Sequence, residues 1–334
     1  CFTSGIRPIM ITGDHKTTAW AVAKELKMIN ENSKMLTGQE LDTLSDAQLL
    51  KEIDNIVVFS RVTPRHKLRI VKALKKKGHV VAMTGDGVND APAVKEADIG
   101  ISMGISGTDV TKEASSMILM DDNFASIVSA IEEGRIIYDN IRKFIRYLLS
   151  CNVGEILTML WTSALGLPLP LLPIQILWMN LVTDGLPAMA LGIDPPQKDV
   201  MNRRPRGKNE NVFSGGLAKK IIYRGFLISI ATLIAFIMTG YYTNGNLAVS
   251  RTAAFSTLVM SQLIFVFECR SERKINLRDN PFSNIYLTLA SVLSAAMMIM
   301  VVHVPFLQPI FHTVPLDVNT WMMIFALAGL SAII

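Results

Sequence analysis

The sequence predicts an α/β domain with a doubly wound parallel sheet, followed by an all-α membrane domain of six helices. Short apolar segments alternate with helical segments up to about residue 122, a pattern typical of strands joined by helical crossovers. Beyond residue 144 most of the sequence consists of apolar runs of about the length that crosses a bilayer. Half of the 334 residues (50%) are hydrophobic, and the mean hydropathy of +0.35 favours a membrane protein over two soluble domains.

Residues 1–122 are expected to contain five strands and five helices. The strands are predicted at 6–11, 56–59, 79–83, 99–103 and 116–120. The helices are predicted at 17–27, 45–54, 64–77, 89–97 and 108–115. Because helices connect successive strands, the strands should pair in parallel with right-handed crossovers.

The stretch Met83 to Ala93 (MTGDGVNDAPA) combines two glycines and two acids at the end of a predicted strand. Ligands of open α/β sheets bind at this end of the strands. The carboxylates of Asp86 and Asp90, beside exposed backbone N–H groups, suit Mg²⁺ with a bound phosphoryl group. Gly85 and Gly87 allow a tight turn and a close approach of a ligand. The alternative is an acidic turn that only caps a helix.

A second polar strand end is Thr12-Gly13-Asp14, which follows the first predicted strand. Such residues before a helix serve either as an N-cap or as a contact for phosphate, and the residues alone leave both readings open. If the two strand ends lie side by side, they line one pocket.

Two motifs carry a resemblance to a known family. Thr84 to Ala93, followed by Ala97 to Gly104 (ADIGISMG), resembles the hinge motif of the P-type ATPases. Asn180 to Pro187 (NLVTDGLP) resembles the calcium pumps of the reticulum, Golgi and bacterial type. The resemblance covers essentially the whole chain. It implies a haloacid-dehalogenase-like phosphorylation domain, Mg²⁺ and ATP as cofactors, and Ca²⁺ as the transported ion.

The resemblance also implies roles for individual residues of the α/β part. Thr12 and Gly13 match positions that contact the phosphoryl group, and Asp14 matches a carboxylate that helps to place nucleotide and metal. Lys67 matches a lysine that neutralises charge on the transferred phosphoryl group, although a solvated surface lysine is the alternative. The remaining predicted site residues are Asn89 and Asp90 for catalysis, Thr84, Gly85 and Asp86 for the cofactor, and Asp86 and Asp90 for Mg²⁺.

The membrane part is expected to begin with a stalk helix, residues 123–143, that continues into the first span without interruption. A hinge near Gly134 is the alternative. The domain covers 144–334, with spans at about 144–165, 171–192, 221–240, 252–268, 284–304 and 319–334. Its basic residues gather in two loops: Lys198, Arg203, Arg204, Arg206, Lys208, Lys219 and Lys220, and then Arg270, Arg273, Lys274 and Arg278. The opposite loops hold only Arg251. This asymmetry predicts that the basic loops and the α/β domain face the cytosol, and it argues against nucleic acid as the partner of the positive charge.

Polar residues inside the first two spans predict a cation site. Ionisable groups at bilayer depth cost at least about 2.5 kcal/mol each and are functional by default. Gly185 to Pro187 is expected to open the second span and free backbone carbonyls. Carboxylate, amide and hydroxyl oxygens favour Ca²⁺, Mg²⁺ or Mn²⁺ over soft ions. The predicted cation ligands are Asn152, Glu155, Asn180, Thr183 and Asp184, together with Gln262, which stands where the resemblance predicts an acid.

The resemblance further implies elements that this sequence does not contain. It has no DKTGT motif with a nucleophilic Asp, no nucleotide-binding or actuator domain and no earlier group of four spans. We therefore expect the carboxyl-terminal part of a pump, inactive alone, whose partners are the bilayer and the amino-terminal part that binds most of the ATP. The membrane would be the cell membrane of a bacterium or the reticulum or Golgi membrane of a eukaryote. The alternatives are a pump for Mn²⁺ or another divalent cation, a non-catalytic membrane module or half of a split pump, and a membrane-tethered phosphatase.

Overall fold

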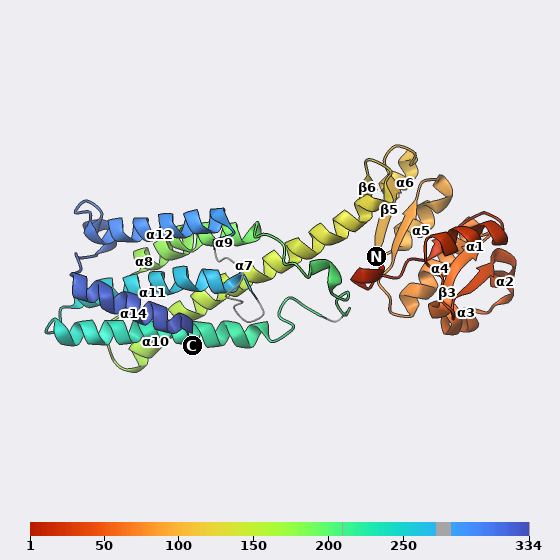
Figure 1. The fold of residues 1–334 in the computed structure, drawn as a ribbon. Helices are drawn as coiled ribbons and strands as arrows, with labels where there is room; N and C mark the ends of the chain where they lie inside the picture. The colour runs from red at the N-terminus through yellow and green to blue at the C-terminus, as the bar shows by residue number, and fades with distance from the viewer. Residues whose placement is uncertain (209, 272–281, 334) are drawn as a thin grey trace. The chain divides into compact units, whose positions relative to one another are not determined.

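The computed structural model describes residues 1–208, 210–271 and 282–333 (Figure 1). The chain forms two compact units, one of Cys1–Glu133 with Lys198–Asn209 and one of Gly134–Gln197 with Glu210–Ile334. Three of the basic residues used to predict the topology, Arg273, Lys274 and Arg278, lie outside the described residues.

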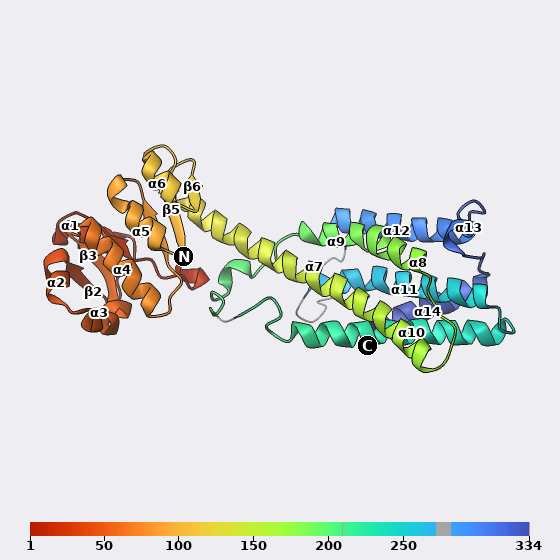
Figure 2. The ribbon, with the colours of Figure 1, turned by 180° about the vertical axis from the view of Figure 1, so that it is seen from behind.

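The first unit contains two three-stranded parallel sheets rather than one continuous sheet (Figure 2). One has the order β1-β3-β2, with β1 at Met10–Ile11, β2 at Lys34–Thr37 and β3 at Ile56–Ser60. The other has the order β4-β5-β6, with β4 at Ala82–Gly85, β5 at Ile99–Met103 and β6 at Met117–Leu119. Every pairing is parallel, as predicted from the helical connections. Within the described residues, β1 and β4 are both edge strands.

The helices of this unit lie close to the predicted ranges. They are η1 (Phe2–Ser4), α1 (Lys16–Glu25), α2 (Gly38–Thr43), α3 (Asp46–Glu52), η2 (Ile53–Asn55), α4 (Pro64–Lys76), η3 (Val88–Asp90), α5 (Ala91–Glu96), α6 (Asp109–Ala114) and η5 (Val200–Asn202). Strand β2 and helix α2 were not predicted, because their segment is short and polar. One local signal marks the start of α2: the Thr37 hydroxyl accepts from Glu40 N at 3.2 Å, and Glu40 accepts from Thr37 N at 2.7 Å. This is a capping box.

The core of the first unit joins its two sheets. Phe59 of β3 and Ile70 of α4 are fully buried, and they belong to the same apolar cluster as Met83 of β4 and Val94 of α5. The two sheets are therefore parts of one hydrophobic core. This shared core fixes the carboxyl ends of β1, β3 and β4 relative to one another, and those ends carry the predicted site.

The long helix α7 runs without a break from Phe124 to Ala164, a length of 41 residues. It begins at the predicted place, where the Asn123 side chain accepts from Ala125 N at 2.9 Å. Gly134 lies within this helical range. Residues 123–143 and the first predicted span thus share one helix.

The second unit continues with a bundle of helices. They are α8 (Pro173–Trp178), the π-helix η4 (Met179–Thr183), α9 (Gly185–Gly192), α10 (Leu217–Tyr242), α11 (Leu247–Cys269), α12 (Ile285–His303), α13 (Gln308–Phe311) and α14 (Val318–Ile333). Four helical segments are long and apolar enough to cross a membrane: Pro173–Gly192, Leu217–Tyr242, Leu247–Cys269 and Ile285–His303. The first and last predicted spans fall on the second half of α7 and on α14, whose apolar part is shorter. For these two segments membrane crossing stays a prediction.

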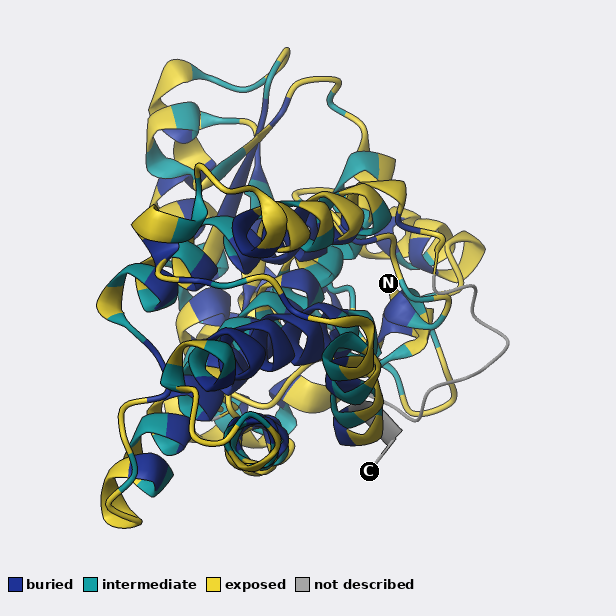
Figure 3. Ribbon diagram, turned by 90° about the vertical axis from the view of Figure 1, so that its left-hand side faces the viewer, coloured by how far each residue is buried: buried dark blue, intermediate teal, exposed yellow. Residues whose placement is uncertain are grey.

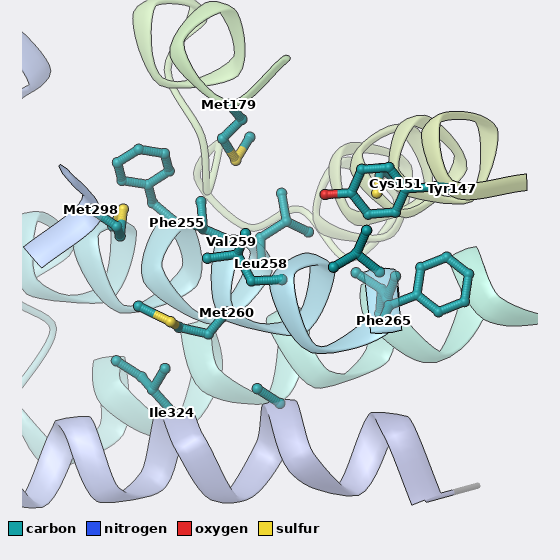
Figure 4. Packing of buried hydrophobic residues seen from close by; sticks show 14 of the residues in the cluster. Tyr147, Cys151, Met179, Phe255, Leu258, Val259, Met260, Phe265, Met298 and Ile324 are labelled. Carbon is teal, nitrogen blue, oxygen red and sulfur yellow. The ribbon is translucent and has the colours of Figure 1, made fainter. Parts of the chain in front are cut away.

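Helix α11 is the interior helix of this bundle. In its most apolar window 83% of the residues are buried, against 33–50% in the other three segments. It packs against α10, α12 and α14. Figure 4 shows its residues Phe255, Leu258, Val259 and Met260 in the core with Tyr147 and Cys151 of α7. Other helices of the bundle have one buried and one exposed face (Figure 3). A polar side chain on α11, such as Gln262, therefore faces protein on every side.

Candidate phosphate and cation sites

The Thr12-Gly13-Asp14 loop is tied to the end of β3. Thr12 N donates to Phe59 O at 2.9 Å, and Arg61 N donates to Asp14 O at 3.1 Å. The Thr12 hydroxyl donates to the Asp14 carboxylate at 2.7 Å. The N-cap of α1 is His15, whose side chain accepts from Thr17 N. Helix capping therefore does not explain Thr12 and Asp14, and the alternative reading of this loop as a cap loses its support.

Gly85 is required by a close approach within the protein. It is the last residue of β4, and a Cβ at this position would lie 2.5 Å from the Cβ of Asp90. The predicted reason for this glycine was access for a ligand, but the atom that approaches belongs to Asp90. Thr84 also lies inside β4 rather than after it, because the strand ends later than the predicted range of 79–83.

Asp90 is held in place by Lys67. The Lys67 ammonium lies 2.5 Å from the Asp90 carboxylate, and the exposed fractions of the two side chains are 20% and 8%. Lys67 is therefore not a solvated surface lysine. The pair joins the first turns of α4 to η3, so it links the segment after β3 to the segment after β4.

The carboxylate of Asp86 and the amide of Asn89 are exposed at the same loop. The backbone of the loop is fixed by α6 and its N-cap: Thr108 N donates to Asp86 O at 2.9 Å, and the Thr111 hydroxyl donates to Gly87 O at 2.8 Å. This arrangement leaves the Asp86 side chain available for a metal ion while Asp90 is engaged by Lys67. Hard carboxylate oxygens of this kind fit Mg²⁺.

In the bundle, three predicted cation ligands are joined by hydrogen bonds. Glu155 of α7 is buried, and its two carboxylate oxygens accept from Asn180 Nδ2 of η4 at 3.0 Å and from Gln262 Nε2 of α11 at 3.2 Å. Residues more than 100 positions apart in the sequence therefore meet at one carboxylate. Gln262 Oε1 has no hydrogen-bond partner in the described part of the chain, so an acceptor is left over at this place.

Asp184 is more deeply buried still, with an exposed fraction of 1%. One of its oxygens accepts from the Tyr147 hydroxyl at 3.1 Å, and the other has no hydrogen-bond partner among the described residues. Leaving buried acceptors unpaired is costly, and carboxylate and amide oxygens are ligands that hard cations prefer. The unpaired oxygens of Asp184 and Gln262 thus fit a divalent cation.

Thr183 and Asn152 are less closely connected to this cluster. The Thr183 hydroxyl donates to Met179 O at 3.1 Å, within its own helix. Asn152 is half-buried on α7, one turn before Glu155. In the described part of the chain, no hydrogen bond joins either side chain to Glu155 or Asp184.

The second span is irregular one turn earlier than predicted. The opening was expected at Gly185 to Pro187, but the wide turn is the π-helix Met179–Thr183, in which Asp184 N donates to Met179 O five residues back at 2.9 Å. Pro187 itself lies in the first turn of α9, where its missing N–H leaves the Thr183 carbonyl without the usual helical donor. The extra residue of a π-helix changes the direction of side chains, and such turns occur frequently at functional sites.

Two protein families match the sequence of this chain. The family described as "Cation transporting ATPase, C-terminus" matches residues 168–334, and "haloacid dehalogenase-like hydrolase" matches residues 3–98. The chain belongs to the cation-transporting ATPases.

Among curated relatives of this cation-transporting ATPase chain are proteins from bacteria and a fungus. It is 57% identical over 333 residues to the "Calcium-transporting ATPase" of Bacillus subtilis, covering 100% of this chain and 37% of that protein. It is 46% identical over 343 residues to "Calcium-transporting ATPase 1" of Bacillus cereus, covering 98% and 38%. It is 39% identical over 363 residues to the "Endoplasmic reticulum calcium ATPase srcA" of Aspergillus fumigatus, covering 98% and 37%. The chain thus spans little more than a third of the length of these relatives.

Tyr147 adjoins this candidate cation site and was not predicted from the sequence. It is fully buried on α7, and it is the donor to Asp184. A signal was present: Tyr147, Cys151 and Glu155 are spaced four residues apart and so share one helix face. The hydroxyl of a tyrosine on that face, two turns before a buried acid, predicts a hydrogen-bond acceptor for it within the bundle.

The predicted cation ligands of this bundle are not a cluster of acids and imidazoles. In residues 1–208, 210–271 and 282–333 no three His, Cys, Asp or Glu side chains are grouped closely enough to hold a metal ion. Cation binding here would therefore depend on two carboxylates supplemented by amide, hydroxyl and carbonyl oxygens. That composition fits the hard divalent cations predicted from the sequence.

Proposed function

We propose that this chain forms the hinge part of the phosphorylation domain and six membrane spans of an ATP-driven pump that exports Ca²⁺ from the cytosol. The observation that carries the proposal is the buried carboxylate of Glu155, which accepts from Asn180 and Gln262 while an oxygen of buried Asp184 stays unpaired. The relatives named calcium-transporting ATPases support Ca²⁺ as the ion. They also extend over almost the whole chain, so a non-catalytic membrane module is not favoured.

In the phosphorylation domain, Asp86 would hold Mg²⁺, which supplies charge neutralisation to the phosphoryl group when bound. Asp90 would support that site through its pair with Lys67. Thr12, Gly13 and Asn89 would donate to phosphoryl oxygens, with Asp14 placing nucleotide and metal. ATP and the phosphorylated Asp would be supplied by residues outside this chain, in the amino-terminal part of the pump.

Helix α7 is the element that we propose to couple the two activities. It follows β6 after a short connection, and it carries Glu155 thirty-one residues after its first residue, Phe124. Alternating access needs an element with two discrete positions. A displacement of α7 on phosphorylation would move Glu155 relative to Asn180 and Gln262 and so change the affinity for the ion.

The decisive experiment replaces Asp184 by Asn in the full-length pump. Ca²⁺-dependent phosphorylation by ATP should be lost, because the carboxylate with the unpaired oxygen is gone. Phosphorylation by inorganic phosphate, which needs no bound Ca²⁺, should survive and shows that the protein is folded. An unchanged Ca²⁺ dependence would reject the assignment of Asp184.

Mn²⁺ is the second candidate ion, because the same oxygen ligands suit it. Uptake of radiolabelled Ca²⁺ and Mn²⁺ by sealed vesicles containing the full-length protein distinguishes the two. Because Gln262 stands where the resemblance predicts an acid, the pump would carry either one or two ions per cycle. Uptake into inside-out vesicles also tests the proposed cytosolic orientation of the α/β unit.

A further inference from the structure

Hydroxyl groups in the bundle are mostly satisfied by their own helix. Ser and Thr side chains in apolar helices usually donate to a carbonyl one turn back. On α11, the hydroxyls of Thr252, Ser256 and Thr257 do so, at 2.8 Å in each case. On α7 and α10 the same is true of Ser150, Thr158, Thr162, Thr232 and Thr239. An interior hydroxyl without this bond is therefore an exception, and it leaves an oxygen that can bind a ligand.

Three interior serines depart from this pattern. The hydroxyls of Ser261 on α11 and of Ser291 and Ser294 on α12 have no hydrogen-bond partner among the described residues. Their exposed fractions are 1%, 7% and 0%, so bulk water does not satisfy them either. A buried hydroxyl left unpaired lowers stability unless something else occupies the place of its partner.

The two serines of α12 lie at the same level as the cation ligands of the second span. Asn284, the N-cap of α12, donates to Ala190 O near the end of α9 at 3.0 Å. Since α12 packs against both α9 and the preceding η4, it runs back along the second span in the opposite direction. Ser291 is seven residues beyond Asn284, and Asp184 is six residues before Ala190, so at about 1.5 Å per residue both lie roughly 10 Å from this contact.

The same serines lie on the inner face of α12. Leu287, Ser291, Ser294 and Met298 are all buried, and their spacing of four, three and four residues places them on one side of the helix. Residues between them, such as Val292 and Leu293, are exposed. The serine hydroxyls therefore belong to the side of α12 that packs against η4, α9 and α11 rather than to its outer side.

We propose that Ser291 and Ser294 complete the cation site from α12, as hydroxyl ligands of the ion or of water molecules bound to it. The proposal deepens the proposed function, on which it rests. It brings together unpaired oxygens from three elements: Asp184 Oδ2 beside η4, Gln262 Oε1 with the adjacent Ser261 hydroxyl on α11, and the two serines of α12. Neutral hydroxyls add oxygen ligands without adding charge, and Ca²⁺ takes six to eight oxygens.

The test compares Ser291→Ala, Ser294→Ala and the double variant with wild type in the full-length protein. The readouts are equilibrium binding of ⁴⁵Ca²⁺ and the rise in unfolding temperature that Ca²⁺ causes, each repeated with Mn²⁺. The double variant should bind the cation about tenfold more weakly, the effect typical of losing groups that support a metal site. Without the cation its unfolding temperature should stay the same or rise, because unpaired hydroxyls have been removed.

Ser256→Ala is the matched control, since Ser256 is fully buried on α11 and its hydroxyl already donates to Thr252 O. This variant should leave cation affinity unchanged. If wild type binds Ca²⁺ or Mn²⁺ and the double variant binds it equally tightly, the serines are packing residues and the inference is wrong, while the proposed function stands. Binding that shifts as expected in a protein that transports neither ion would support the serine ligands and contradict the pump.

Discussion

Lys143 and Asp194 form an ion pair of 2.7 Å whose side chains are 2% and 3% exposed. The pair is embedded in further hydrogen bonds: Lys143 also donates to Asn140, and Asp194 also accepts from Arg270 and Asn284 at 2.9 and 3.0 Å. This network connects α7 to the segment after α9, the end of α11 and the start of α12. Because every charged group of the network is paired, removing one member leaves another charge buried without a partner and lowers the free energy of unfolding.

Asp194→Ala should therefore lower the free energy of unfolding by about 3–5 kcal/mol. Thermal unfolding of the detergent-solubilised protein, calibrated against a denaturant series, measures the loss. Arg203→Ala is the control, because the Arg203–Asp199 pair is 30% and 42% exposed and contributes about 1 kcal/mol or less. A loss of the same small size for both variants would show that the buried network does not stabilise the bundle.

Gly85→Ala should displace Asp90 and weaken phosphorylation. The added Cβ would lie 2.5 Å from the Cβ of Asp90, so η3 must shift and the pair between Asp90 and Lys67 is disturbed. Gly87→Ala is the matched control in the same loop, since the nearest atom to its Cβ is 4.0 Å away and its φ is −102°. Phosphorylation by inorganic phosphate in the full-length protein should fall for Gly85→Ala only. Equal losses in the two variants would contradict the claim that the approach of Asp90 to Gly85 is what phosphorylation requires.

Lys67→Ala should lower the rate of phosphoryl transfer by about 100-fold or more, as expected when a positive group beside the developing charge is removed. Lys72, on the exposed side of the same helix, supplies the control, and Lys72→Ala should retain the wild-type rate. Single-turnover phosphorylation of the full-length pump measures both. If Lys67→Ala transfers the phosphoryl group at the wild-type rate, the Lys67–Asp90 pair has only a structural role.

Asp122 provides a prediction about pH. Hydrogen bonds donated by Ile105 N at 2.9 Å and Ser106 N at 2.7 Å lower the pKa of this carboxyl from 3.8 to about 2. Because the folded pKa lies below the unfolded one, the stabilisation is fully present above pH 4 and is lost as the pH falls through about 2. Asp122→Asn keeps a residue type that tolerates the positive φ of 51° while removing the charge.

The unfolding temperature of Asp122→Asn should therefore be lower than that of wild type at pH 7, and the difference should shrink between pH 4 and pH 2. Scans of the α/β unit by circular dichroism in the full-length protein over this range measure it. A difference that is independent of pH would mean that the carboxylate charge does not strengthen the two bonds.

Variants of Gln262 test whether it is a neutral ligand of the proposed cation site. Gln262→Ala removes the donor to Glu155 and the unpaired Oε1, so the apparent affinity for Ca²⁺ should fall. Gln262→Glu places a second carboxylate beside Glu155, and metal binding must then displace more protons. Its Ca²⁺ dependence should change more steeply between pH 6 and pH 8 than that of wild type. Ca²⁺-dependent phosphorylation measures both effects. If Gln262→Glu and wild type show the same pH dependence, Gln262 does not take part in cation binding.

Local patterns in the sequence determined most of the elements and their order, with β2, α2 and the π-helix η4 as exceptions. The apolar run before Thr84, the glycines and acids of the loop, and Pro64 at the start of α4 each act within a few residues. Helix and strand periodicity likewise depends on near neighbours, which is why α4, β3, β5 and the continuous α7 lie where they were predicted. The composition of the spans also indicated oxygen ligands for a hard cation.

Only the tertiary structure decided which of these side chains meet. The bond from Tyr147 to Asp184 and the pairing of Lys143 with Asp194 join elements that are distant in the sequence. The division into two sheets and the unpaired hydroxyls of Ser291 and Ser294 likewise depend on how such elements pack. Whether a buried polar atom finds a partner depends on how helices pack, and packing sums many weak contacts that no short stretch of sequence contains. The candidate ligands could therefore be predicted as residue types, but which of them meet was decided by the fold.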